Sequence, residues 1–297
     1  MNLKTSDASS LAKSAITHSL DVGVIQFKGD RSAYEESQVR LIEAIENAGE
    51  QGVKILVCPE CACSEYCFDS KEEALPYSET LDGQFADRVS AITKQYQFWC
   101  FVGVIERDQE QRLFNTVFTF DPSGSRYRYR KRLLFDADNT WAESGDVHPA
   151  ELPVTLTLDP IRRGALLHDS TPPYPIFDVF GWRTTVGICM DLNDPRFIDF
   201  CEQAEVELIA FPTNWIDQGY DVIPYWAHVL RDVNRATLLA ANSYGEDGPF
   251  CLRGRSAILQ ADPPTLFGLA PASGDYLITC QLEYPSLQPV KERREEL

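Results

Sequence analysis

Apolar residues along the chain recur at two different spacings, and together these predict an alternation of helices and strands. The segments 35–51 and 82–97 carry apolar side chains three or four positions apart, as Val39, Ile42 and Ile45 do, which is typical of a helix with one buried face. Two further helices are expected at 195–205 and 224–234. Short apolar runs bounded by turn residues predict strands at 22–27, 54–58, 98–105, 113–120, 126–130, 176–180, 184–188, 208–211, 238–242, 256–260 and 276–282. This alternation indicates an α/β fold built from layers.

A short basic run at 126–130 has a strict pattern of its own, because arginine and tyrosine alternate along it. A turn at Asp121-Pro-Ser-Gly124 precedes it, so the run forms the second strand of a predicted hairpin. Alternation places the arginines on one face of the strand and the tyrosines on the other. The run is therefore interpreted as a half-exposed strand in preference to an anion site.

The chain shows no internal repeat and no low-complexity linker, which predicts a single domain over 21–290. We expect a flexible tail at 1–20 and a charged, solvated tail at 291–297. The segment 146–174 is rich in proline and the least regular, with one possible strand at 153–158. Long irregular loops in compact domains are usually functional or disordered, so substrate choice is expected to depend on this insert.

Composition excludes several classes of protein. The chain has 297 residues, with 27 Lys+Arg against 45 Asp+Glu and a formal net charge of −18. Nucleic-acid binding needs a basic face, so no nucleic-acid partner is expected. No apolar run approaches the roughly 18 residues of a membrane-spanning helix, so no membrane partner is expected either.

The cysteine count bears on the cellular compartment. Nine cysteines are an odd number, and residues 1–20 lack the apolar core of a secretory signal. A reducing, cytoplasmic location is therefore expected. A weak organellar presequence at the N-terminus is the alternative, which the absence of arginine there disfavours.

Three residues of different chemistry follow predicted strands: Glu60, Lys131 and Cys189. Catalytic groups in α/β folds gather where strands end. A thiol nucleophile, a carboxylate base and an ammonium that stabilises negative charge together suit attack on a carbonyl or nitrile carbon. Residues of these types are common at strand ends, however, so the pattern alone leaves the question open.

The sequences around these residues are more specific. Cys58-Pro-Glu60, the block at 129–135 (Tyr-Arg-Lys-Arg-Leu-Leu-Phe) and the block at 187–192 (Gly-Ile-Cys-Met-Asp-Leu) resemble the three signatures of the nitrilase (carbon–nitrogen hydrolase) superfamily, in the family's order. The stretches 211–215 and 240–243 also look familial. The resemblance extends from about 21 to 282.

The resemblance implies a four-layer αββα sandwich that forms a homodimer or a larger homo-oligomer. It also implies that Glu60 is the general base, Lys131 the oxyanion stabiliser and Cys189 the nucleophile, with no cofactor and no metal. Physical chemistry adds two expectations. The neighbouring lysine should lower the pKa of Cys189, and burial should raise that of Glu60.

Supporting residues are expected around this triad. By resemblance, the backbone N–H of Met190 is a second oxyanion donor and Glu143 an additional carboxylate. Asp191 is expected to orient the loop after Cys189. Asn214 and Trp215 follow a predicted strand and line the substrate pocket, unless Trp215 belongs to the core.

The substrate is less defined. Cys-Met-Asp-Leu, with the acidic residues 136–138, Trp141 and Glu143 after the lysine, most resembles the branch that deamidates N-terminal Asn or Gln of proteins. We therefore expect release of ammonia from a linear carboxamide, either a small molecule or a peptide N-terminus. An N-carbamoyl hydrolase and a nitrilase remain alternatives, since they use the same triad. A non-catalytic binding module is disfavoured because all three triad types are present.

Two other kinds of site have weaker support in the sequence. Cys58, Cys61, Cys63 and Cys67 contain a possible zinc half-site, but no second Cys or His pair follows at suitable spacing, which favours buried free thiols. A Cys–His hydrolase is disfavoured because none of the four histidines lies in a recognisable block with Cys189.

Overall fold

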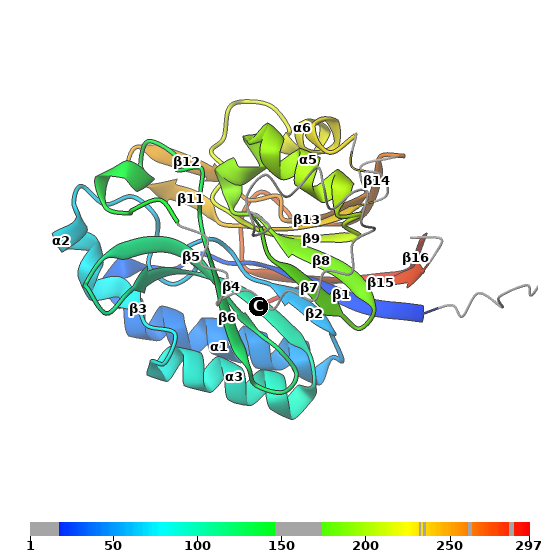
Figure 1. Ribbon diagram of the computed structural model, residues 1–297, viewed down its shortest axis with the longest axis horizontal. Coiled ribbons are helices and arrows are strands. Elements are labelled where there is room, and N and C mark those ends of the chain that lie inside the picture. Colours follow the sequence, from blue (N-terminus) through cyan, green and yellow to red (C-terminus); the bar gives the residue numbers. More distant parts are fainter. Residues whose placement is uncertain (1–17, 146–173, 232, 234–235, 261–262, 285–287) are drawn as a thin grey trace, which may run out of the picture.

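Two sheets pack face to face between two layers of helices. This arrangement is seen in the computed structural model, which describes all residues except 1–17, 146–173, 232, 234–235, 261–262 and 285–287 (Figure 1). Helices α1 (Tyr34–Glu50) and α3 (Gln84–Tyr96) cover the outer face of one sheet, and α5 (Pro195–Gln203) and α6 (Val222–Val229) cover the other. The predicted four-layer αββα sandwich is thus confirmed.

The first sheet has the order β16-β15-β1-β2-β4-β5-β6, with the short β3 paired to β4. Strands β1, β2 and β4 run parallel, and β6 has the same direction because it lies two antiparallel steps from β4. The bounds are β1 (His18–Gln26), β2 (Ile55–Val57), β3 (Ser78–Glu79), β4 (Trp99–Arg107), β5 (Leu113–Phe120), β6 (Arg126–Arg130), β15 (Tyr276–Tyr284) and β16 (Gln288–Glu296).

The second sheet has the order β14-β13-β10-β9-β8-β7, with β8, β9 and β10 parallel. Its strands are β7 (Ile176–Val179), β8 (Trp182–Val186), β9 (Leu208–Thr213), β10 (Thr237–Asn242), β13 (Ala257–Gln260) and β14 (Thr265–Leu269). A separate hairpin of β11 (Tyr244–Asp247) and β12 (Phe250–Arg253) was not anticipated. The short helix α2 (Lys71–Ala74) was also missed. No helix among the described residues is long and apolar enough to cross a membrane.

Alternation along the central strands creates two separate cores. In β1, Val24 faces the second sheet while Ile25 faces the helices. In β2, Val57 likewise faces the second sheet and Leu56 faces the helices. Because successive side chains of a strand point to opposite faces, a strand covered on both sides must be apolar at nearly every position. This explains why the central strands were recognisable as apolar runs.

The α1 helix forms as predicted, but its buried face is rotated from the expected one. Ile42 and Ile45 are buried as expected, whereas Val39 is 41% exposed. Leu41 takes its place in the core. A spacing of three drifts around a helix of 3.6 residues per turn, so the series starting at Val39 leaves the buried face at its first member.

Strand β6 confirms the interpretation of the basic run. Tyr129 packs in the core between the sheets, and the arginines lie on the opposite face. Arg126 pairs with Asp87 at 2.6 Å, and Arg128 and Arg130 pair with the buried Glu106 at 2.8 and 2.7 Å. These arginines are therefore occupied by carboxylates of the protein itself.

The prediction that residues 291–297 form a tail is wrong. Residues 291–296 belong to β16, which pairs antiparallel with β15 at the edge of the first sheet. The side chains of 293–297 are exposed, so their charge remains solvated while the backbone is paired. Edge strands commonly carry charged side chains, and such a strand lacks the apolar pattern used to find the others. At the other end, β1 begins at His18, so 18–20 are not part of a tail. The remaining expected tail, the possible strand 153–158 and nearly all of the insert lie outside the described residues.

Gly103 in β4 permits the close approach of the loop that follows β2. Its N–H donates to the Pro59 carbonyl oxygen at 3.1 Å, and its own carbonyl accepts from Ala62 N–H at 3.0 Å. A Cβ at this position would lie 2.3 Å from the Pro59 oxygen and 2.5 Å from Glu60 Cα. Both are backbone atoms of a tightly bonded loop, so they have little room to move.

We predict that Gly103→Ala destabilises the fold by about 1–3 kcal/mol, the usual scale for overpacking. The matched control is Gly23→Ala in β1, whose new methyl group would meet only side-chain atoms, the nearest 3.2 Å away. Urea unfolding of the two variants and the wild type checks this. Equal unfolding midpoints for the two variants would contradict it.

Candidate functional site

The edge formed by the ends of β2, β6 and β8 brings together the residues singled out in the sequence. Glu60 follows β2, Lys131 directly follows β6, and Cys189 begins the 3₁₀-helix η5 (Cys189–Asn193) after β8. Lys131 N–H also donates to Asn115 O of β5 at 2.8 Å, which fixes the start of its loop to the sheet.

Lys131 is held between two carboxylates. Its ammonium donates to Glu60 Oε1 at 2.7 Å and to Asp138 Oδ2 at 2.6 Å, and all three side chains are fully buried. Asn115 joins the two acids through its Nδ2, at 2.7 Å from Glu60 Oε1 and 2.8 Å from Asp138 Oδ1. This network leaves one of the three ammonium protons without a partner among the described residues.

The electrostatics favour a charged lysine. Burial opposes the charge, but Asp138 and then Glu60 attract it, and the net effect raises the pKa of Lys131 well above its ordinary value. For Glu60, burial raises the pKa, although the attraction of Lys131 acts in the opposite direction. This direction was expected from the sequence.

Asp138, in the 3₁₀-helix η3 (Asp138–Thr140), occupies the place that the sequence analysis gave to Glu143. The side chain of Glu143 is exposed, while its backbone N–H donates to Leu113 O at 2.8 Å. Asp138 is instead turned inwards and accepts from Phe135 N–H at 2.8 Å as well as from the lysine. Glu143 is therefore not the supporting carboxylate of this cluster.

Cys189 sits at a strained turn between β8 and η5. Its φ of +43° lies in the left-handed region, which is uncommon for a residue other than glycine and concentrates at functional sites. The side chain is 8% exposed. The sharp turn presents the thiol at the end of the strand, close enough for the charges of Glu60 and Lys131 to act on it.

The expectation of a lowered thiol pKa is wrong. Burial and then the negative charge of Glu60 raise the pKa of Cys189 to about 12. Lys131, the Thr213 hydroxyl and the Asn214 N–H act in the opposite direction but are outweighed. The lysine is already neutralised by two carboxylates, so it has little attraction left for a thiolate. In the free protein the thiol is thus protonated at neutral pH.

Asp191 connects the Lys131 loop to the Cys189 loop. Its carboxylate accepts from Ile188 N–H at 2.9 Å, Leu133 N–H at 3.0 Å and the Tyr129 hydroxyl at 2.8 Å. It is fully buried. This placement agrees with the orienting role that the sequence suggested.

Asn214 and Trp215 have different surroundings. Asn214 N–H donates to Glu60 Oε2 at 2.7 Å and its Nδ2 donates to Glu60 O at 3.0 Å, so this residue belongs to the cluster. The Trp215 ring packs against aromatic residues, with ring centroids 5.4 Å from Tyr225 and 5.8 Å from Trp226. Trp215 is therefore better described as a core residue than as a residue that lines the substrate pocket. The half-buried Met190 is the second residue of η5.

Sequence reasoning missed Asn115 and Tyr66. Asn115 is a polar residue inside the apolar run of β5, and that interruption was a usable signal. Tyr66 lies six positions after Glu60 and is 2% exposed. The Lys131 ammonium lies 5.4 Å from the centroid of its ring.

The cysteine cluster consists of free thiols. Cys58, Cys61 and Cys63 are buried and Cys67 is half-buried, and all nine cysteines of the chain are free. Within the described part of the chain, no group of His, Cys, Asp and Glu side chains is arranged to hold a metal ion.

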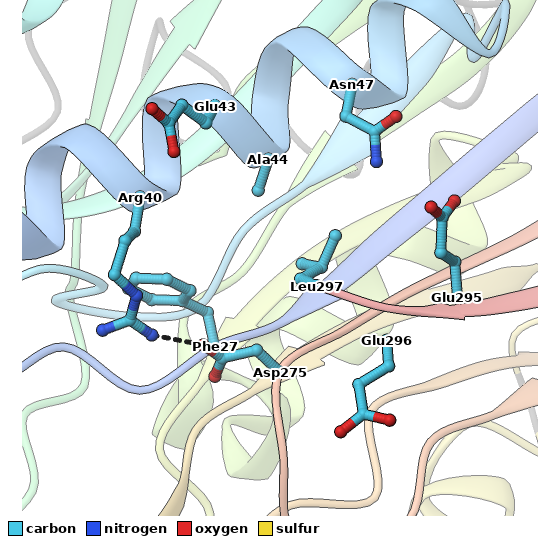
Figure 2. Close-up of a pocket in the computed structure, with 9 residues that line it drawn as sticks. All are labelled: Phe27, Arg40, Glu43, Ala44, Asn47, Asp275, Glu295, Glu296 and Leu297. Carbon is cyan, nitrogen blue, oxygen red and sulfur yellow. Dashed lines mark hydrogen bonds and ion pairs between the residues drawn. The ribbon is translucent and has the colours of Figure 1, made fainter.

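A separate surface pocket of about 320 Å³ lies between α1 and the end of β16 (Figure 2). Arg40 pairs with Asp275 there and covers the Phe27 ring at 4.7 Å. The remaining lining is largely acidic, with Glu43, Glu295 and Glu296. None of the cluster residues described above lines this pocket.

Curated proteins similar to this chain are amidases. It is 23% identical over 293 residues to the protein N-terminal amidase of Schizosaccharomyces pombe, covering 88% of this chain and 99% of that protein. The Saccharomyces cerevisiae protein N-terminal amidase is 27% identical over 55% of this chain and 36% of its own length. Human omega-amidase NIT2 is 26% identical over 61% of this chain and 59% of its own. The chain thus spans less than two thirds of these last two relatives.

Solved structures show the same fold. A mutant of the Nesterenkonia AN1 amidase from the nitrilase superfamily superposes with a TM-score of 0.69 at 16% identity, covering 90% of this chain and 92% of that one. Another mutant of that amidase, in complex with acrylamide, has a TM-score of 0.70 at 15% identity and covers 90% of each chain. The model of the carbon–nitrogen hydrolase family matches residues 22–262, and with the cluster at the strand ends this shows that the chain belongs to that family.

Proposed function

We propose that the protein is a thiol amidohydrolase that cleaves the C–N bond of a linear carboxamide and releases ammonia through a thioester at Cys189. The observation that carries the proposal is the buried Glu60–Lys131 pair beside a thiol on a strained turn. Similarity to enzymes named protein N-terminal amidase and omega-amidase supports it.

The geometry suggests the following sequence of steps. Glu60 takes the thiol proton as Cys189 Sγ attacks the carbonyl carbon, because a thiol with a raised pKa needs a base during attack. The remaining N–H of the Lys131 ammonium donates a hydrogen bond to the oxygen that becomes negative. Glu60 then returns the proton to the departing nitrogen, and ammonia leaves. Water, activated by Glu60, hydrolyses the thioester to the acid and the free thiol.

The specific substrate that we propose is the side-chain amide of an N-terminal Asn or Gln. Two relatives carry the name protein N-terminal amidase, and one of them is matched over nearly its whole length. Selection of a peptide N-terminus requires recognition of its α-ammonium, which an acidic pocket would favour. Cytoplasmic location and a homo-oligomeric state remain part of the proposal. Nine free cysteines suit a reducing compartment.

We predict that Cys189→Ala lowers the turnover of the best carboxamide substrate by at least about a thousandfold, the scale seen when a catalytic nucleophile is removed. The matched control is Cys201→Ala on α5, a buried cysteine whose pKa is shifted by burial alone. Release of ammonia is measured for both variants. Substantial turnover by Cys189→Ala would exclude the thioester mechanism.

We predict that Asp138→Asn moves the high-pH limit of activity to lower pH. Asp138 is the main attraction that keeps the pKa of Lys131 high against burial, so its neutralisation lowers that pKa. The ammonium, which must be protonated to act, is then lost earlier as pH rises. Profiles of kcat/KM against pH for wild type and variant check this, with circular dichroism at each pH as control. Coincident high-pH limits would contradict the role given to Asp138.

We predict that a short peptide with a free N-terminal Asn is deamidated, whereas its N-acetylated form is not. Acetylation removes the positive charge and leaves a pocket acceptor unpaired. Mass spectrometry of both peptides after incubation measures the difference of one mass unit. Equal conversion would remove the N-terminal specificity, and fast turnover of a simple amide alone would leave the general amidohydrolase.

A further inference from the structure

Tyr66 presents an unpartnered hydroxyl within the catalytic cluster. The side chain is 2% exposed, and its hydroxyl oxygen is buried with no hydrogen-bond partner among the described residues. Its ring faces the Lys131 ammonium at 5.4 Å. A buried hydroxyl without a partner is unfavourable and uncommon in folded proteins, so its position beside Lys131 requires an explanation.

The backbone around Tyr66 is fixed. Asp247, at the end of β11, accepts from Tyr66 N–H at 2.6 Å and from Cys67 N–H at 3.2 Å. Arg31 approaches Asp247 at 3.5 Å and pairs with Glu65 at 2.7 Å. The unpartnered hydroxyl is therefore held in place by a bonded loop and does not result from a loose segment.

The charges around the hydroxyl make it a donor. Burial raises the pKa of Tyr66, and Asp138 and Glu60 raise it further, while Lys131 has the opposite effect. The phenol therefore stays protonated. Lys131 also has one proton that no described residue accepts. The site therefore has two donors that can bind an oxygen of the substrate.

A second unpartnered atom complements the first. Asn214 is 3% exposed, and its Oδ1 has no partner in the described part of the chain, although its N–H and Nδ2 both bond to Glu60. A primary carboxamide carries one oxygen that accepts and an NH₂ group that donates. The site thus offers donors and an acceptor that match this group, whereas a nitrile has no N–H to give to Asn214.

We infer that Tyr66 and Asn214 bind the reacting carboxamide: the Tyr66 hydroxyl donates to its oxygen beside Lys131, and Asn214 Oδ1 accepts from its NH₂ group. This assignment rests on the proposed function and deepens it. It makes Tyr66 a catalytic residue that acts on the oxygen where charge develops. It also makes the site selective for amides over the corresponding nitriles.

The test is Tyr66→Phe, which deletes only the hydroxyl. Because no described residue bonds to that hydroxyl, the variant should melt at the same temperature as the wild type or slightly higher. Its kcat/KM for the carboxamide should fall by about a hundred- to a thousandfold, mainly through kcat, as for other donors to a developing oxyanion. Methyl methanethiosulfonate, a thiol reagent without an amide group, should modify Cys189 at an unchanged rate.

The matched control is Tyr34→Phe. The Tyr34 hydroxyl bonds to Tyr77 O at 3.0 Å and to Glu79 Oε1 at 2.7 Å, outside the catalytic cluster. This variant should lose thermal stability and keep the wild-type kcat/KM, which is the opposite of the result expected for Tyr66→Phe. If Tyr66→Phe matches the wild type in kcat/KM, or loses activity only together with stability, the role of Tyr66 is overturned.

Substrate comparison separates this inference from the proposed function. If the wild type hydrolyses no carboxamide, the proposed function fails and the inference fails with it. If the wild type is active and Tyr66→Phe is equally active, only the inference on Tyr66 fails. If the wild type hydrolyses a nitrile as fast as the carboxamide of the same carbon skeleton, the assignment of Asn214 is overturned.

Discussion

The burial of Lys131 between two carboxylates is the interaction on which the rest of the site depends. A buried charge is costly unless it is paired and hydrogen-bonded, and removal of one partner from such a set is strongly destabilising. Here β2 provides Glu60, β5 provides Asn115 and the loop after β6 provides the lysine and Asp138. Asn214, which follows β9, connects this network to the second sheet through its hydrogen bond to Glu60. The charge network thus joins loops at the strand ends of both sheets.

The same network determines how the thiol reacts. Burial and the negative charge of Glu60 outweigh the attraction of Lys131, so Cys189 stays protonated at neutral pH. In the proposed mechanism, proton transfer to Glu60 is therefore coupled to attack on a bound substrate. Without substrate the buried thiol is therefore neutral, and a neutral thiol reacts much more slowly with oxidants than a thiolate. The strained turn at Cys189 keeps the sulfur in place without ionising it.

Much of the fold could be predicted from the sequence, because strands covered on both faces must be apolar. The central strands and the helices α1 and α3 lie within a few residues of the expected ranges, and Glu60, Lys131 and Cys189 lie at strand ends as expected. The strands β11, β12 and β16 were missed for a common reason. Neither the edge strand β16 nor the hairpin β11–β12 has to be apolar, so neither gave a signal. Spacing also cannot tell which acid of a loop turns inwards, so the sequence indicated Glu143 although Asp138 is the acid that contacts Lys131. The direction of the pKa shift of Cys189 was also missed, because burial and the charge of Glu60 outweigh the attraction of Lys131.

The hydrogen bond from Asn214 to Glu60 joins two residues that are 154 positions apart and belong to different sheets. Closing a loop of this length has an entropic cost that is recovered only once the contacts between the two sheets have formed. A nascent or partly folded chain can therefore hold either half of the site but not the assembled one. Under the proposed mechanism hydrolysis requires both halves, so an incompletely folded copy would cleave no amide.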